Sequence, residues 1–157
     1  MPVAQSAYRE DHNVAFAGMI ANPQTCDFDS LEWFGSRAGQ FGYACQQGAT
    51  PERAIAGIAA GTFRGILAID RTRQPGDEDT YVAGVMATVM WRGDIWVPVE
   101  SAVVAGNDVS ADTVTGQLSS AAAASTQIVI AGARWMTSQA TAGGLARVRL
   151  SGYQAAS

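Results

Sequence analysis

Hydrophobic and polar residues alternate with a period of two along several short stretches of this chain, which is the period of a β-strand. The clearest stretch is Thr80–Trp91. One of its faces would carry Val85, Ala87, Val89 and Trp91, and the other Gly84, Met86, Thr88 and Met90. Because both faces are mostly apolar, the pattern predicts a strand inside a sheet rather than at a wet edge.

A second clear alternation covers Leu145–Leu150, where Ala146, Val148 and Leu150 oppose Leu145, Arg147 and Arg149. Glycine-containing turns separate further predicted strands, which are Thr62–Asp70, Val109–Val114, Gln117–Leu118 and Ile128–Ile130. Cys26–Gly48 predicts one or two strands bent at glycines. We expect the low-complexity stretch Ser119–Gln127 to be a loop.

The stretch WRGDIWV, residues 91–97, contains Arg92-Gly93-Asp94, a tripeptide known for cell adhesion. Gly93-Asp94 fits the two central residues of a type II′ turn, which favours glycine first. Asp94–Val99 would then be the return strand of a hairpin in which Trp91 faces Trp96, and Pro98 would mark an edge or the end of the pairing. We therefore interpret the tripeptide as a turn, since an adhesive one needs an exposed loop.

These elements predict one all-β domain, either a small β-sandwich or a partly open β-barrel with hairpins and an extended N-terminal arm. The polar and irregular residues 1–13 would form the arm, residues 14–151 the β-rich domain and residues 152–157 a tail. The aliphatic composition agrees, because 13 Val and 8 Ile stand against 5 Leu and branched side chains suit strands.

The charge pattern narrows the class of partner. The chain has a formal net charge of −4, which argues against binding to nucleic acid. All 10 cationic side chains are arginines, which are enriched at protein interfaces, although a GC-rich genome would also favour arginine codons. We also expect no signal peptide and no membrane-spanning segment, because the first residues are polar and no apolar run is long enough.

The sequence contains no arrangement of residues that indicates catalysis or a metal or cofactor site. The single histidine, His12, lies in the polar N-terminal segment, and the two cysteines, Cys26 and Cys45, do not have metal-ligand spacing. The acidic run Asp77–Asp79 lacks the spacing of a calcium loop, and Asp27 with Asp29 is better explained as two surface carboxylates than as a glycosidase pair. We expect a protein that is not an enzyme, with the four tryptophans mainly in its core.

Four stretches in a fixed order resemble the structural cement, or decoration, proteins of tailed-phage heads. They are AFAGMIAN (15–22), FRGILAIDRTRQPG (63–76), VAGVMATVMWRGDIWVPVESAVVAGNDV (82–109) and GARWMTSQATAGGLARVRL (132–150). The chain departs from the family pattern at Asn107, which is an extra residue, and at Trp135-Met136, where an aromatic residue followed by an acid is expected.

This resemblance implies a protein on the exterior of the capsid, without cofactors, that binds the major capsid protein and itself, commonly as a homotrimer, and neither nucleic acid nor membrane. The interface candidates are Tyr8, Phe16, Ile20, Trp33, Phe34, Arg134 and Trp135. Two alternatives remain: a virion module that binds host glycans through tryptophans and loop carboxylates, and a small hydrolase, which has the least support.

Overall fold

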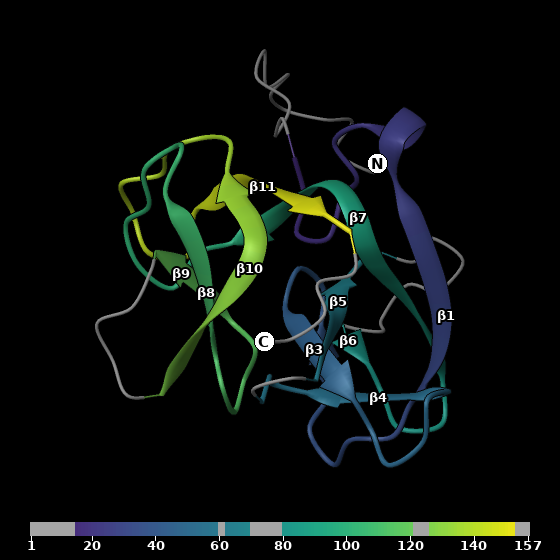
Figure 1. The fold of residues 1–157 in the computed structure, drawn as a ribbon. Helices are drawn as coiled ribbons and strands as arrows, with labels where there is room; N and C mark the ends of the chain where they lie inside the picture. The colour runs from purple at the N-terminus through teal and green to yellow at the C-terminus, as the bar shows by residue number, and fades with distance from the viewer. Residues whose placement is uncertain (1–14, 60–61, 70–79, 121–125, 153–157) are drawn as a thin grey trace, which may run out of the picture.

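The computed structural model describes residues 15–59, 62–69, 80–120 and 126–152, and it confirms the predicted all-β class (Figure 1). The strands are β1 (Asp27–Trp33), β2 (Gly39–Gln40), β3 (Ala44–Gln47), β4 (Arg53–Ala56), β5 (Phe63–Leu67), β6 (Thr80–Tyr81), β7 (Met86–Pro98), β8 (Asp108–Asp112), β9 (Leu118–Ser120), β10 (Gln127–Trp135) and β11 (Leu145–Ser151). A 3-10 turn, η1 (Pro23–Thr25), precedes β1, and the Asn22 side chain accepts a hydrogen bond from the backbone N–H of Gln24.

Five strands close into a ring that forms the first lobe. The order is β1-β4-β3-β5-β7, and β7 pairs again with β1. Closure of a sheet on itself gives its strands a partner on both sides and removes the exposed edges that favour aggregation. The short ribbon of β2 and β6 adds to this lobe.

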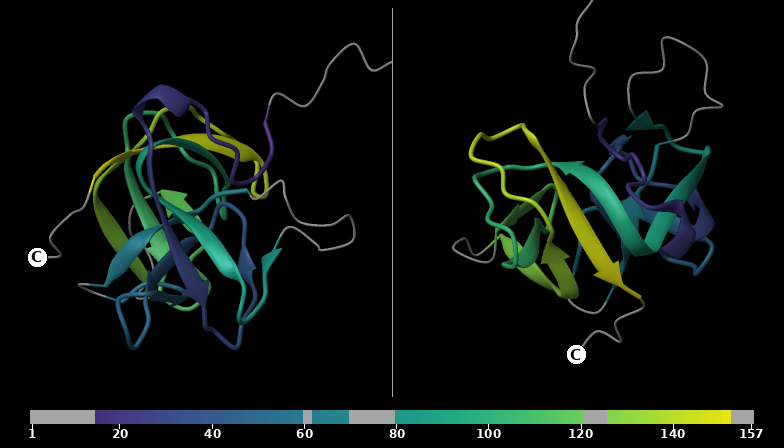
Figure 2. Two further views of the ribbon diagram at one scale, coloured as in Figure 1. Left: turned by 90° about the vertical axis from the view of Figure 1, so that its right-hand side faces the viewer. Right: turned by 90° about the horizontal axis from the view of Figure 1, so that it is seen from above.

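The second lobe extends from the same strand, in the order β7-β11-β10-β8-β9. Its last strand returns to the chain that follows β7, since Val99 bridges Leu118 and the Glu100 N–H donates to the Leu118 carbonyl at 2.9 Å. Figures 1 and 2 show β8, β9 and β10 on one side of the molecule, β1, β3 and β4 on the other, and β11 lying along β7. Strand β7 therefore belongs to both lobes.

Each lobe has its own hydrophobic core, and the strands between the lobes contribute to both. On β7, Val89 packs in the core of the first lobe and Met90 in that of the second. On β5, Leu67 likewise packs in the core of the first lobe and Ile66 in that of the second. The prediction that both faces of the strand are buried is confirmed at Val89 and Met90, whose side chains point to opposite faces, whereas Met86 is 56% exposed.

The predicted hairpin at Gly93-Asp94 is wrong, because β7 is a single strand of 13 residues that runs through both. Its first half pairs with β1 up to Arg92 and also with β5 at Val89 and Met90. Its second half, from Arg92 to Pro98, pairs with β11. Trp91 and Trp96 thus lie on one strand, and Trp96 is opposite Arg147 instead. Both halves of β7 pair with strands that are distant in the sequence. These pairs replace the pairing of the two halves with each other that a two-residue turn would need.

Gly93 provides the change of direction between the two halves of β7. Its φ of 120° lies in a region that other residues rarely adopt. A Cβ atom there would lie 2.8 Å from the Cβ of Cys26, so the chain before β1 packs directly against the glycine backbone. A strand that passes from one sheet to another commonly bends at such a position.

Other boundaries agree in part with the sequence pattern. The alternation of Leu145–Leu150 is confirmed, with Ala146, Val148 and Leu150 on the buried face of β11. Pro98 is the last residue of β7, which agrees with one of the two predicted roles of this proline, the end of pairing. The predicted strand Thr80–Trp91 is split between β6 and β7, and the predicted Ile128–Ile130 is part of the longer β10. The predicted N-terminal arm lies outside the described residues, and the domain boundaries stay a prediction.

We expect Gly93→Ala to destabilise the protein by about 2–4 kcal/mol, because it adds backbone strain and a steric conflict with Cys26. Gly106→Ala is the matched control, since Gly106 also has a positive φ but a Cβ there meets nothing within 4 Å. Strain alone predicts a cost of about 1–2 kcal/mol for the control. Urea unfolding of both variants measures the difference, and equal costs would show that the packing at Gly93 is unimportant.

Candidate interaction surface

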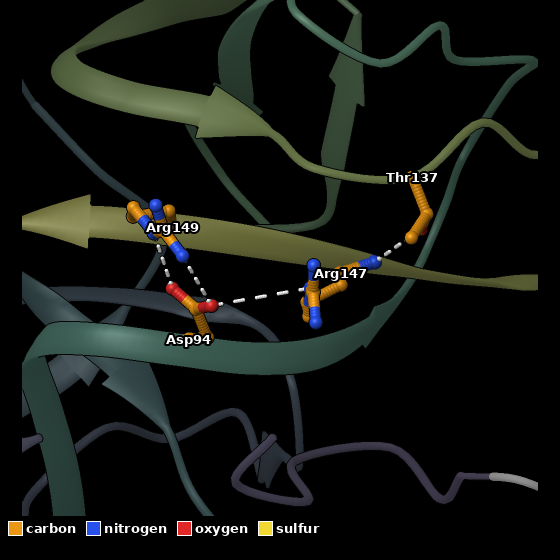
Figure 3. Close-up of polar contacts among 4 residues, drawn as sticks. All are labelled: Asp94, Thr137, Arg147 and Arg149. Atoms are coloured by element: carbon orange, nitrogen blue, oxygen red, sulfur yellow. Dashed lines mark hydrogen bonds and ion pairs between the residues drawn. The ribbon is translucent and has the colours of Figure 1, made fainter. Parts of the chain in front are cut away.

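The Arg92-Gly93-Asp94 tripeptide lies at the bend of β7, and its carboxylate is covered by arginines from β11 (Figure 3). Asp94 is only 3% exposed. The Arg149 guanidinium donates to both of its oxygens, with Nε 2.7 Å from Oδ1 and Nη2 2.9 Å from Oδ2. The Arg147 Nε lies 3.9 Å from Oδ2. The hydrogen bond and charge of Arg149, with a smaller contribution from Arg147, outweigh burial and hold the pKa of Asp94 below its usual range.

The register of the sheet brings these groups together. Arg149 is directly opposite Asp94 on the neighbouring strand, and Arg147 is two residues away on the same face. The backbone N–H of Arg147 donates to the Thr137 hydroxyl at 2.8 Å, which ties this part of β11 to the preceding loop. An adhesive role requires an accessible carboxylate, so the structure supports the conclusion that this tripeptide is not adhesive, for a different reason from the predicted turn.

The described residues contain no arrangement suited to nucleophilic or metal-assisted catalysis. Burial raises the pKa of the Cys45 thiol to about 12, so Cys45 is not a thiolate at neutral pH. Asp27 and Asp29 are ion-paired with Arg92 and Arg64 respectively. In this part of the chain no group of three or more His, Cys, Asp or Glu side chains could hold a metal ion, and no helix is long and apolar enough to cross a membrane.

Two of the predicted interface residues lie in the core, so these predictions are wrong. Trp33 and Trp135 are both 0% exposed. Each indole N–H donates to a backbone carbonyl, Trp33 to Arg37 at 2.9 Å and Trp135 to Ser119 at 3.3 Å. A side chain that is fully packed inside its own lobe cannot contact a partner protein unless that lobe unfolds.

The remaining interface candidates are at least partly accessible where the structure describes them. Phe16 and Phe34 are 54% and 52% exposed. Ile20 is half-buried and bridges Ile95 beside β7. Arg134 is exposed and ion-paired with Asp108. Tyr8 lies outside the described residues. The role of these residues in an interface stays a prediction.

Phe34 borders a surface hollow of about 450 Å³, which we call the Phe34 hollow. Its lining residues come from both lobes and are Phe34, Gly35, Ser36, Arg37, Ile55, Ala56 and Val114. Val114, on the opposite lobe from Phe34, is 58% exposed. Ile55 and Val114 carry no signal in the sequence that marks them as surface candidates, because they come together only in the fold.

The turn that carries Val114 is fixed by Asp112 at the end of β8. Its Oδ1 accepts hydrogen bonds from the backbone N–H of Val114 at 2.8 Å and of Thr115 at 2.7 Å, and from the Thr115 hydroxyl at 3.1 Å. Burial raises the pKa of Asp112, but these hydrogen bonds and the Arg37 charge outweigh it and leave the pKa lowered. The Gly116 carbonyl then accepts from the Ala44 N–H at 2.8 Å, which joins the turn to the first lobe.

Comparison with known proteins gives a family match and solved structures of similar fold. The family described as structural cement protein (E217 gp24/Pam3 gp6) matches residues 3–151. A chain from the solved structure "The capsid of Myoviridae Phage XM1" matches with a TM-score of 0.74 and 18% sequence identity, over 95% of this chain and 98% of that chain. At this identity the likeness shows the fold. No curated protein matches the chain.

We expect Asp94→Asn to lower stability at pH 7 and to have a much smaller effect near pH 2. The pKa of Asp94 is lower in the folded protein than in the unfolded chain, so its stabilising contribution is complete above the unfolded value of about 4 and disappears as the pH falls through the folded value. Urea unfolding of wild type and variant at both pH values measures this. An equal stability difference at both would contradict a role for the charged carboxylate.

We expect Asp112→Ala to destabilise the protein by about 1–2 kcal/mol, because three hydrogen bonds that fix the turn are lost. Asp108→Ala, on the same strand, is the control. It removes an exposed ion pair with Arg134 and should cost less than about 1 kcal/mol. Thermal unfolding of both variants checks the order, and a larger cost for Asp108→Ala would contradict it.

Proposed function

The chain belongs to the phage structural cement protein family, and from this premise we propose that it stabilises a phage capsid by binding the outside of the expanded shell. There it bridges neighbouring major capsid protein subunits and resists the pressure of the packaged DNA. The observation that carries this proposal is the family match across residues 3–151, which includes both lobes. The fold shared with a chain of a phage capsid structure supports it.

The physical character of the described surface fits a binding role rather than catalysis. Large apolar side chains such as Phe16, Phe34 and Val114 are more than half exposed, while the cysteine with the raised pKa is buried. Aromatic and arginine side chains are the types that contribute most often to protein interfaces. Because each lobe is packed around its own hydrophobic core, the scaffold holds such side chains in fixed positions.

We further propose that the protein acts as a homotrimer at three-fold and quasi-three-fold positions of the shell. Selectivity for the expanded shell follows if only the expanded lattice brings the parts of the composite site together. Repetition over the lattice strengthens modest single contacts through avidity. Tyr8, Phe16, Ile20, Phe34 and Arg134 remain the candidate contacts from the sequence.

The alternative of a glycan-binding module loses support from the structure. It requires accessible tryptophans, but Trp33 and Trp135 are fully buried, and Trp91 and Trp96 are only partly accessible. A sugar platform needs the flat face of the ring to be open to the ligand. We therefore keep capsid binding as the single proposed function.

The test is co-sedimentation of the purified protein with expanded heads of its own phage that lack this protein, with unexpanded procapsids as the control. We expect saturable binding to the expanded heads, little binding to procapsids and greater resistance of the bound heads to heat. Absence of binding to both shells would reject the proposed function.

A further inference from the structure

The Phe34 hollow is distinguished from the other exposed apolar positions by lying where the two lobes meet. Phe34 and Ile55 belong to the first lobe, and Val114 is on the turn between β8 and β9 of the second. Hydrogen bonds fix this turn at Asp112 and at Ala44. The walls of the hollow are therefore held in place before any partner arrives.

Phe34 is itself held in position on the surface. The Arg53 guanidinium lies over its ring, 4.0 Å from the centroid, and the Arg53 Nε donates to Glu32 at 3.0 Å. The parallel pairing of β1 with β4 places Arg53 opposite Glu32, and the Phe34 N–H donates to the Ala54 carbonyl at 3.0 Å. One face of the ring is thus covered by the protein itself. A fixed aromatic ring loses little conformational entropy on binding, which suits an anchor residue.

The size of the hollow selects the kind of partner. Seven of the residues that the structure describes line it, whereas a standard protein–protein interface uses about 20–30 residues on each side and buries about 800 Å² per partner. The hollow is too small to be the core of a stable dimer of this chain. Its volume of about 450 Å³ is enough for one or two bulky side chains of a single segment.

The charge beside the hollow adds a second requirement. The exposed Arg37 lines it, and among the described residues its side chain forms no ion pair or hydrogen bond. The charge of Arg37 helps to lower the pKa of the Asp112 carboxyl, but the Oδ1 of Asp112 accepts hydrogen bonds from its own turn. Arg53, the other nearby cation, is already paired with Glu32. A partner that brings a carboxylate near Arg37 would complement this charge.

We propose that the Phe34 hollow receives a segment of the major capsid protein that carries a bulky apolar side chain and, close to it, an Asp or Glu. The apolar side chain packs between Phe34 and Val114, and the carboxylate binds Arg37. This assignment rests on the proposed function, because it takes the capsid protein as the partner. It makes the junction of the two lobes the face that is turned toward the shell.

The test compares matched variants of the full chain in a titration with expanded heads, read out by co-sedimentation. Phe34→Ala and Val114→Ala remove the two walls. Their controls are Phe28→Ala, at the other end of β1, and Val104→Ala, which is 57% exposed against 58% for Val114. We expect both hollow variants to weaken binding by on the order of tenfold, as for interface anchors, and both controls to bind within about twofold of wild type. Thermal unfolding of each isolated variant confirms that it is folded.

Charge reversal tests the second requirement. Arg37→Glu should weaken binding at least as much as Phe34→Ala, whereas Arg92→Glu, whose side chain is 59% exposed beside Asp27, should not. The difference in binding between Arg37→Glu and wild type should shrink at high salt, as expected for a charge contact. If Arg37→Glu weakens binding no more than Arg92→Glu does, the proposed charge contact is overturned.

The outcomes separate this inference from the proposed function. If wild type fails to bind heads, the proposed function fails. If wild type binds and the hollow variants bind equally well, or no worse than their controls, only the assignment of the hollow is overturned. If Phe34→Ala instead changes the oligomeric state of the free protein in analytical ultracentrifugation while binding to heads is unchanged, the occupant is a second copy and the capsid assignment is wrong.

Discussion

Strand β7 places alternate side chains in two separate cores, and each lobe can close only if this strand changes direction part of the way along. Val89 and Met90 show the division between the cores, and Gly93 directly follows the last residue of β7 that pairs with β1 and lies in the part that pairs with β11. The backbone at Gly93 has a positive φ and lies against Cys26, so a side chain does not fit there without a shift of its neighbours. All strands of the nine-stranded sheet connect to β7 through their pairings, whereas β2 and β6 form a separate ribbon.

The bend also explains why a carboxylate is tolerated in a nearly inaccessible position. Asp94 follows Gly93 directly and faces β11, where Arg149 offers two donors and Arg147 further positive charge. Burial of an unpaired charge is costly, whereas a paired one with satisfied hydrogen bonds is acceptable. The arginines remain partly in solvent, which limits the loss of their hydration. The positive φ that requires glycine at position 93 and the buried charge that requires arginine partners at position 94 therefore occur at adjacent residues.

The sequence pattern predicted what depends on local alternation and missed what depends on distant partners. Leu145–Leu150 and the two apolar faces of Val89 and Met90 were predictable, since period-two patterning reflects burial directly. The hairpin at Gly93-Asp94 was wrong, because a glycine that bends a strand and one that begins a turn look alike without knowledge of the pairing. Trp33 was named as an interface candidate although the tryptophans were expected mainly in the core, because residue type alone does not separate a core aromatic residue from an interface anchor. The Phe34 hollow could not be predicted, since Val114 reaches it only through the contact between lobes.

The order of the strands along the chain also has a consequence for synthesis. β1, β3, β4 and β5 all precede β7, so the ring of the first lobe can close as soon as Pro98 has left the ribosome. β11 is the last strand, and until it emerges one edge of the second half of β7 has no ladder partner. A charged residue on an unpaired strand opposes pairing with other chains. We therefore expect the Asp94 carboxylate, before Arg149 is made, to protect the nascent chain from association during the interval in which the molecule is half built.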